Sequence, residues 1–222
     1  MIAFLLCILA SFLVGDLLHR RGASAELSRK SVHVCSCLLI CAYPAFGIDE
    51  RTLFRIAIGS ALALSLLRGS VLMRAIMSVE RESYGDLLLP ASVAIATAIG
   101  VSYPAFFAAY LVLGISDALA GLVGRAYGCR RYCLLGHAKT YLGSTAFFLS
   151  GLAILTAVGL WLGLAPLAAL IIGGVVGAAL TLIEACCHKG LDNLCVPLAT
   201  ALSLQAWLST PMHGIAAAGG GA

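Results

Sequence analysis

The sequence predicts an all-α, polytopic membrane protein with about eight transmembrane helices, within a range of roughly seven to nine. Of its 222 residues, 61% are hydrophobic and only 11% are charged, whereas about a quarter of an average soluble domain is charged. The mean hydropathy is +1.03, and apolar segments recur from the first residue to about Ser209. Lipid is therefore the expected solvent for most of the chain.

Eight apolar stretches are the candidate spans. They are Ile2–Leu18, Val32–Phe46, Thr52–Leu67, Leu87–Val101, Tyr103–Val123, Gly143–Leu162, Ala165–Ile183 and Leu194–Leu208. Several are shorter than the roughly 20 residues of a typical spanning helix, so we expect tilt, local thinning of the bilayer or longer true boundaries. No polar domain separates them, which predicts one transmembrane domain over 1–213 and a loose tail over 214–222.

The first stretch lacks the basic leader of a secretory signal, and its arginines follow the apolar run, so it is interpreted as a retained helix. Most of the nine cysteines lie in apolar runs, where Cys behaves as a small hydrophobic residue, and the others lack zinc-ribbon spacing. Packing is therefore preferred over a metal–thiolate site. The net charge of +4, without a basic stripe, gives no case for binding nucleic acid.

The basic residues predict the orientation of the chain in the membrane. All but two of the 14 Lys and Arg residues fall in the loops after the first, third, fifth and seventh stretches, the exceptions being Arg51 and Arg55. By the positive-inside rule these loops are cytoplasmic and both termini lie outside. The regular alternation also favours eight spans.

Acidic residues and histidines gather on the same predicted face, although the positive-inside rule does not require this. Apart from Asp49 and Glu50, every acidic residue lies at or near it, as do four of the five histidines. Short external loops explain part of this asymmetry. The remainder predicts an active site on the cytoplasmic face.

One face of a predicted helix combines a carboxylate with four small residues at spacings of three or four: Asp117, Gly114, Gly121, Gly124 and Gly128. A seam of glycines for helix packing is one interpretation. A carboxylate within a span is costly and usually faces a cavity, a partner or an ion, so the functional interpretation is a seam that admits a phosphate chain with its divalent cation. Arg125 and Lys139 follow and can neutralise phosphates, although topology alone also places bases there.

Arg29, Lys30 and His33 form a second candidate group, at the predicted junction of the first cytoplasmic loop and the second span. In a helix Arg29 and His33 are one turn apart, with Lys30 beside them. Interfacial snorkelling is sufficient to explain the two bases. An imidazole at the start of an apolar helix still needs a partner.

Two further segments carry ionisable residues. Glu82–Asp86 precedes Pro90 and predicts a turn into the fourth span, with Asp86 well placed for the helix dipole.

In the other segment, EACCHKGLDNLCVP, Glu184 and His188 are predicted to lie one helical turn apart, and Gly190 is predicted to end that helix. Asp192 and Asn193 can then cap the next helix. Capping explains Asp192 about as well as catalysis does, but it does not readily explain Glu184.

In this order, the segments resemble a family of membrane-bound, CTP-dependent lipid-alcohol kinases that includes dolichol kinase, phytol kinase and the CTP-using diacylglycerol kinase. The resemblance covers most of the chain. It rests on RKSVH (Arg29–His33), ESYGDLLLP (Glu82–Pro90), SDALAGLVGRAYG (Ser116–Gly128), KTYLGS (Lys139–Ser144), and Glu184 followed by DNLCVP (Asp192–Pro197). The ordered set is specific, whereas each segment alone is weak.

The Asp117 and Lys139 segments are also similar to the related CDP-diacylglycerol synthases, which make a CDP-lipid. Those synthases end in a Pro-Gly-His-Gly-Gly stretch that this chain lacks, and Glu184 with Asp192-Asn193 matches the kinase-type ending. Phosphoryl transfer is therefore preferred, with cytidylyl transfer as the alternative. The ESYG segment is closer to the phytol and polyprenol kinases, and a CTP-dependent diacylglycerol kinase stays open.

The resemblance implies that CTP and a membrane lipid alcohol give CDP and a lipid phosphate, with Mg²⁺ as cofactor. The implied catalytic residues are Asp117, Lys139, His33, Asp192 and Glu184, and the implied metal ligands are Asp117, Asp192 and Glu184. The implied nucleotide-binding residues are Arg29, Lys30, Gly121, Gly124, Arg125, Gly128, Lys139, Thr140, Gly143 and Asn193. We expect His33 or a carboxylate to orient or deprotonate the alcohol, which would enter through a lateral opening between helices.

A small membrane transporter is the non-enzyme alternative, because it also uses glycine seams and polar residues within helices. Transport needs a pathway to both faces, whereas the ionisable groups here gather at one face and no inverted repeat is evident. The expected partners are the lipid bilayer, a nucleotide and the lipid alcohol. A homo-oligomer is compatible with the sequence.

Overall fold

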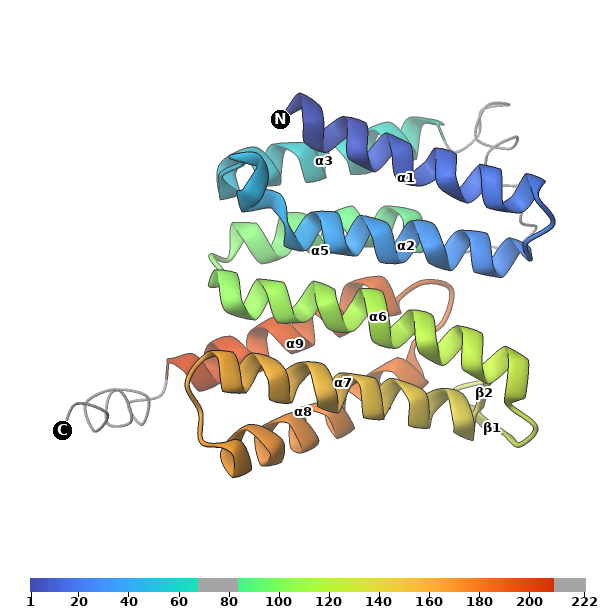
Figure 1. Ribbon diagram of the computed structural model, residues 1–222, viewed down its shortest axis with the longest axis vertical. Helices are drawn as coiled ribbons and strands as arrows, with labels where there is room; N and C mark the ends of the chain where they lie inside the picture. Colours follow the sequence, from blue (N-terminus) through green and yellow to red (C-terminus); the bar gives the residue numbers. More distant parts are fainter. Residues whose placement is uncertain (68–83, 210–222) are drawn as a thin grey trace.

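The computed structural model describes residues 1–67 and 84–209. Within these ranges the helices are α1 Ile2–Arg20, α2 Ala25–Cys41, the 3-10 turn η1 Tyr43–Phe46, α3 Glu50–Leu67, α5 Gly85–Ala98, α6 Tyr103–Tyr127, α7 Tyr141–Trp161, α8 Pro166–Cys186 and α9 Asp192–Leu208. Two short strands, β1 Arg131–Leu134 and β2 His137–Thr140, lie between α6 and α7. The all-α prediction is confirmed (Figure 1).

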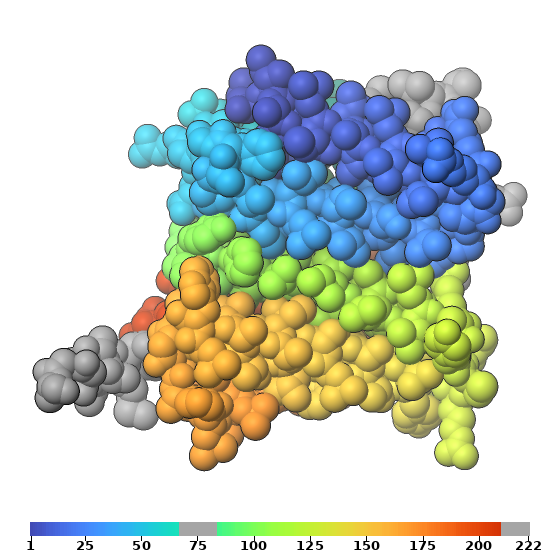
Figure 2. Space-filling model, viewed as in Figure 1, coloured from blue at the N-terminus to red at the C-terminus, as the bar shows by residue number. Residues whose placement is uncertain are grey.

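The helices form two layers of four, one behind the other in Figure 1. In the front layer α1 packs on α2, α2 on α6, and α6 on α7, so these four helices cover the face seen in Figure 2 in that order. In the rear layer α3 packs on α5, α5 on α9, and α9 on α8. The layers are joined where α6 contacts α9 and α7 contacts α8. Helix α6 is therefore central to the bundle.

Successive helices run in opposite directions, so the predicted site segments meet at one end of the bundle. The end of α1, the start of α2, the end of α6 and the hairpin lie together at the right of Figure 1, and the N-terminus lies at the opposite end. We call the end of the bundle that carries the hairpin the motif end. It is formed by the last turns of α1, α6 and α8, the first turns of α2, α7 and α9, and the hairpin.

Among the described residues, four helices, α1, α6, α7 and α8, are long and apolar enough to cross a membrane, and α6 is the most buried of them. Helix α5 is apolar but has only 14 residues. Each predicted span overlaps one helix. Helices α2 and α9 have only 17 residues, and α3 carries three charged residues, Glu50, Arg51 and Arg55. The fold fits an all-α membrane protein, while the number of eight spans stays a prediction.

The predicted second span, Val32–Phe46, begins and ends too late. Helix α2 starts seven residues earlier, at Ala25, and Ser24 Oγ caps it by accepting a hydrogen bond from the Leu27 amide at 3.2 Å. After α2 the turn η1 begins, because Pro44 lacks an amide hydrogen and disfavours helical backbone at the residue before it. The RKSVH segment therefore lies inside α2 and not at a loop junction.

The β-hairpin between α6 and α7 was not predicted from the hydrophobic pattern. Its strands pair antiparallel around Leu135 and Gly136, whose φ angles of +48° and +80° form the turn. Thr140, the last residue of β2, also caps α7, since its Oγ1 accepts a hydrogen bond from the Gly143 amide at 3.0 Å. Lys139 is therefore held in a strand immediately before a capped helix.

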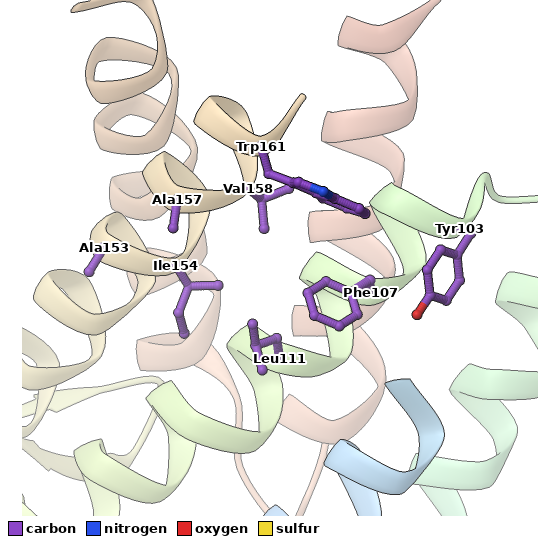
Figure 3. Close-up of a pocket in the computed structure, with 8 residues that line it drawn as sticks. All are labelled: Tyr103, Phe107, Leu111, Ala153, Ile154, Ala157, Val158 and Trp161. Atoms are coloured by element: carbon purple, nitrogen blue, oxygen red, sulfur yellow. The ribbon is translucent and has the colours of Figure 1, made fainter. Parts of the chain in front are cut away.

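Aromatic side chains gather at the other end of the bundle. Tyr43 of η1 packs edge-on against Tyr103 and Phe106 of α6, with ring centroids 5.8 and 5.5 Å apart. Phe107 lies 6.0 Å from Trp161 of α7. These five residues define the aromatic end, and beside them an apolar groove of about 580 Å³ is lined by residues of α6 and α7 (Figure 3).

Within the described ranges, buried hydrophobic residues form a core that includes residues from Phe4 to Leu204. Glu82, Ser83 and the predicted tail 214–222 lie outside those ranges. The domain boundary at 213 also lies outside them and stays a prediction.

Candidate functional site

The Asp117 carboxylate of α6 is buried against two side chains of α2. Lys30 Nζ donates hydrogen bonds to Asp117 Oδ2 at 2.5 Å and to the Asp117 backbone oxygen at 3.1 Å. His33 Nε2 lies 3.5 Å from the same carboxylate oxygen. The side chains of Lys30, Asp117 and His33 are only 5%, 8% and 9% exposed. The costly carboxylate inside a predicted span therefore has a buried cation as its partner.

A close approach of α2 to α6 makes this cluster possible. Lys30, His33 and Cys37 recur at helical spacing on α2 and so share one face. Cys37 packs against Gly114 of α6, where an added Cβ would lie 2.6 Å from the Cys37 Cβ. Because Gly114 has no side chain, the two helices approach closely enough for Lys30 to reach Asp117.

Glu26 connects arginines from both helices at the motif end. Its two oxygens accept hydrogen bonds from Arg29 at 3.1 and 2.8 Å, and Oε2 lies 3.2 Å from Nη2 of Arg125 in α6. Burial raises the pKa of Glu26, but Arg29 and Arg125 lower it by more, so the pKa is below its ordinary value. Glu26 is therefore an ionised carboxylate shared by two guanidinium groups.

Lys139 of β2 forms an ion pair with Glu184 near the end of α8. The Glu184 side chain is 6% exposed and that of Lys139 is 23% exposed. Burial is the largest single influence and lowers the pKa of Lys139, but the Glu184 carboxylate together with more distant acidic charges raises it above its ordinary value. The charges of Asp192 and Asp117 act in the same direction as Glu184, which places Lys139 in the electrostatic neighbourhood of both carboxylates.

Asp192 begins α9 and has no ion-pair partner within 4 Å among residues 1–67 and 84–209. Burial, and next the charge of Asp117, raise its pKa to about 6 from an ordinary 3.8, although nearby lysines oppose this. The N-cap position is Leu191, and Asp192 is the first residue of the helix. Asp192 is therefore not the N-cap itself, but its Oδ1 accepts a hydrogen bond from the Asn193 amide at 3.1 Å in the first turn. A carboxylate whose pKa is raised by a second carboxylate is an arrangement that a divalent cation relieves.

Tyr84 and Gly85, the described residues that lead into α5, bond to the segment that begins α9. The Tyr84 amide donates a hydrogen bond to the Lys189 carbonyl at 2.8 Å, and Asn193 Nδ2 donates one to the Gly85 carbonyl at 2.8 Å. Asn193, a predicted nucleotide-binding residue, thus fixes the start of α5 beside the start of α9. Its observed contact is structural.

The glycine seam of α6 is filled by protein atoms. An added Cβ would lie 2.9 Å from Lys30 Cε at Gly121, 2.6 Å from Thr140 Oγ1 at Gly124, and 2.8 Å from Thr140 Cβ at Gly128. At Gly143 of α7 it would lie 2.9 Å from the Ala120 carbonyl oxygen. These contacts favour helix packing as the role of the glycines, and they assign Thr140 to packing and to capping α7.

His188 does not lie one helical turn after Glu184, because α8 ends at Cys186. Its ring instead stacks on His137 of β2, with centroids 4.0 Å apart and planes inclined by 14°. This contact and the Lys139–Glu184 ion pair together attach the hairpin to the end of α8.

The three predicted metal ligands do not form one cluster. In the two described ranges, no group of three or more His, Cys, Asp or Glu side chains is arranged to hold a metal ion. Glu184 is paired with Lys139, whereas Asp117 and Asp192 interact electrostatically. Mg²⁺ on a nucleotide needs only one or two carboxylates besides phosphates and water. Asp117 is paired with Lys30 just as Glu184 is paired with Lys139, so the metal ligands stay a prediction.

The apolar groove at the aromatic end does not open onto the charged cluster. Its α6 side is formed by Tyr103, Phe107 and Leu111, at spacings of four (Figure 3). Leu111 and Asp117 are separated by about 9 Å along the helix and by roughly a third of a turn around it. The two residues therefore face different neighbours, and the lateral opening for an alcohol stays a prediction.

Several features of the site had not been predicted. Glu26 was not singled out, although its spacing of three from Arg29 is a readable signal for an ion pair. Lys30 was expected to bind phosphate, but its observed partner is Asp117. The contact of His137 with His188 depends on the unpredicted hairpin.

The fold and these ion pairs define a membrane protein with an ionisable site at one end of a helical bundle. The chain is 28% identical over 197 residues to a phytol kinase of Synechocystis sp., in an alignment that covers 87% of this chain and 84% of that protein. This similarity confirms the resemblance to the membrane-bound lipid-alcohol kinases and supports a lipid-alcohol kinase at the level of the family. No family model and no solved structure matches the chain.

Proposed function

We propose that the chain is a CTP-dependent kinase that phosphorylates the hydroxyl of a membrane lipid alcohol of the polyprenol, dolichol or phytol type. The observation that carries this proposal is the buried cluster of Asp117, Lys30 and His33, with Asp192 and Lys139 in its electrostatic neighbourhood. Phosphoryl transfer depends mainly on positioning and on neutralising charge, and this cluster offers both.

The proposed acceptor is an isoprenoid alcohol, because the similar protein of Synechocystis sp. is a phytol kinase. CTP is proposed as donor from the family resemblance. The hydroxyl would lie at the motif end while its chain stays among the helices or in lipid, as the low polarity of the rest of the bundle requires.

Asp117 and Asp192 are the proposed ligands of Mg²⁺. When bound, the ion would neutralise charge on the donor phosphates. Lys30 orients Asp117 through its hydrogen bonds to the carboxylate and to the backbone oxygen. Glu184 is assigned to holding Lys139 and not to the metal.

The remaining roles follow from charge and position. Lys139, Arg29 and Arg125 are proposed to bind phosphate oxygens. The lipid hydroxyl oxygen forms a bond to the terminal phosphorus, and the bond from that phosphorus to the bridging oxygen breaks as CDP leaves with the electron pair. His33 is proposed to take the hydroxyl proton, since its imidazole lies beside the Asp117 carboxylate.

The test is product analysis with purified protein in detergent, supplied with CTP, Mg²⁺ and phytol or a polyprenol. A lipid monophosphate and CDP in equal amounts are expected. Diacylglycerol and phosphatidate serve as alternative acceptors. If only diacylglycerol were phosphorylated, or if phosphatidate gave a CDP-lipid, the proposed acceptor or reaction would be wrong.

We also propose that the motif end faces the cytoplasm and that both termini lie outside. Cys129 and Cys133, near and in the hairpin, are exposed, as is Cys186 at the end of α8. A membrane-impermeant maleimide should therefore label these residues only in inside-out vesicles. Replacing all three by Ser provides the control, and labelling from the outer face of intact cells would contradict the orientation.

A further inference from the structure

We propose that Glu26 is a positioning residue that holds Arg29 and Arg125 together as a guanidinium clamp for the terminal phosphates of the nucleotide. The clamp comprises these three residues and joins the start of α2 to the end of α6. The proposal rests on the proposed function and adds to it a carboxylate outside the family segments.

The contacts place the carboxylate beneath the two guanidinium groups. The Glu26 side chain is 12% exposed, whereas those of Arg29 and Arg125 are 46% and 50% exposed. Glu26 engages Nε and Nη2 of Arg29 and Nη2 of Arg125. A guanidinium has five N–H donors, so each arginine keeps donors for an anion that approaches from the exposed side.

The clamp lies next to the Asp117 cluster. A Cβ added to Gly121 would lie 3.6 Å from Glu26 Oε1 and 2.9 Å from Lys30 Cε. Gly121 follows Asp117 by one helical turn. The Arg29 charge also interacts with the carboxylates of Asp117 and Asp192. Phosphates bound by the clamp would thus be close to the carboxylates proposed to hold their cation.

Two physical effects make Glu26 necessary for this arrangement. Its negative charge offsets the repulsion between two arginines that must stand near each other. Its hydrogen bonds also restrict two long side chains that would otherwise lose rotamer freedom only when the ligand binds. Loss of the Glu26 charge should therefore weaken nucleotide binding and leave the chemical step nearly unchanged.

A purely structural role is the alternative, because Glu26 lies in the first turn of α2, where a carboxylate favours the helix dipole. Ser24 separates the two explanations. It caps the same helix end by accepting a hydrogen bond from the Leu27 amide. Among the described residues, Ser24 forms no hydrogen bond with Arg29 or Arg125. Ser24→Ala thus weakens the helix end and leaves the clamp intact.

The experiment compares Glu26→Gln with Ser24→Ala and Asp16→Asn in the detergent-purified protein. Asp16→Asn is the matched loss of one negative charge, since Asp16 pairs with Arg20 at 2.7 Å on the exposed end of α1. We expect the KM and Kd for CTP to rise about tenfold in Glu26→Gln, as for the loss of one charge-assisted contact. Its kcat, and all constants of both controls, should stay within about twofold of the wild type.

An unchanged KM in Glu26→Gln, beside an active wild type, would overturn the clamp but not the proposed function. An equal rise in Ser24→Ala would overturn it by showing a structural role. A wild type that neither binds CTP nor phosphorylates a lipid alcohol would overturn both proposals.

If Glu26→Gln cannot be purified, Arg29→Gln and Arg125→Gln, alone and combined, give a second test. Arginines that act as a unit should lose most of the affinity for CTP with the first substitution. Strictly additive losses would overturn the clamp.

Discussion

The motif end and the aromatic end of the bundle are built from the same central helix but are stabilised in different ways. At the aromatic end, Tyr103, Phe106 and Phe107 of α6 each contact several apolar neighbours. At the motif end, Asp117 of the same helix depends on Lys30 and, more distantly, on His33. Apolar contacts are individually small and replaceable, whereas a buried charge relies on its partner.

This difference indicates which substitutions should lower activity and which should lower only stability. Ion pairs such as Lys30–Asp117 are weak evidence for stability, because their desolvation cost is large. A chain that keeps them at one end, and packs aromatic rings at the other, retains them for what the charges do. Substitutions of the buried charged residues at the motif end should therefore lower activity, and those at the aromatic end should chiefly lower stability.

The largest effect is expected for Asp117→Asn. Kinase activity should fall by about 100-fold or more, since a charge that neutralises or positions the reacting groups is lost. Lys30 would be left buried without its partner, which typically costs about 3–5 kcal/mol. Turnover and thermal unfolding in detergent measure the two effects.

The double variant Asp117→Asn with Lys30→Met sharpens this result. It removes both buried charges and should recover much of the lost stability, while activity stays absent. Full activity in the single variant would show that the Asp117 cluster is not the site.

The next effect is expected at the hairpin. Lys139→Gln should raise the KM for CTP or lower kcat by about 10- to 100-fold, because a charge-assisted phosphate contact is lost and Glu184 is left buried and unpaired. Arg130→Gln is the matched control, since Arg130 is exposed beside the same hairpin. The measurement is the kcat and KM for CTP of both variants. Equal values in Lys139→Gln and Arg130→Gln would show that Lys139 is not part of the site.

A smaller effect, on stability, is expected for Asp192→Asn. The native pKa of Asp192, about 6, exceeds the ordinary 3.8, so the native state binds more protons than the unfolded state between these values. The contribution of this group to stability therefore falls as pH rises through 6. Without metal, Asp192→Asn should raise the midpoint of thermal unfolding at pH 7.

Metal removal tests whether Asp192 is a ligand of Mg²⁺. EDTA should abolish wild-type activity, and Mg²⁺ with CTP should raise the wild-type unfolding temperature. Asp192→Asn should lose most of this thermal shift. A variant that responds to Mg²⁺ and CTP as the wild type does would contradict the assignment of Asp192 as a ligand.

The smallest effect on activity is expected at the aromatic end. Phe107→Ala removes ring contacts with Tyr103 and Trp161, each at 6.0 Å, together with the burial of the ring, and should cost about 2–4 kcal/mol of stability. Activity at a temperature where the variant is folded should stay within about twofold. A large loss of activity in the folded variant would mean that the groove takes part in the reaction.

The sequence predicted which residues would gather at the motif end but not how they pair. The sequence identifies both Asp117 and Lys30 as candidate site residues. Their ion pair depends on the register between α2 and α6, which is set by the packing of Cys37 against Gly114. That register is a tertiary property, and no local pattern reports it. Asp192 and Glu184 were likewise selected together, but Lys139 reaches only Glu184 because the hairpin holds it there.

The helix boundaries failed where hydrophobicity and capping disagree. The first turns of α2 carry Glu26, Arg29 and Lys30, so an apolar window begins too late, although Ser24 is a readable cap. The hairpin was missed because a pair of four-residue strands is too short to give a clear alternating pattern.

The close approach of α6 to α7 has a further consequence for how the site tolerates variation. A Cβ added to Gly143 would lie 2.9 Å from the Ala120 carbonyl oxygen, and one added to Gly124 would lie 3.3 Å from the Gly143 Cα. Even a methyl group at either position would therefore push α7 outward, and Lys139, four residues before Gly143, would move with it. The position of Lys139 relative to Asp117 thus depends on direct backbone contact between α6 and α7. A larger side chain at either glycine would increase that distance.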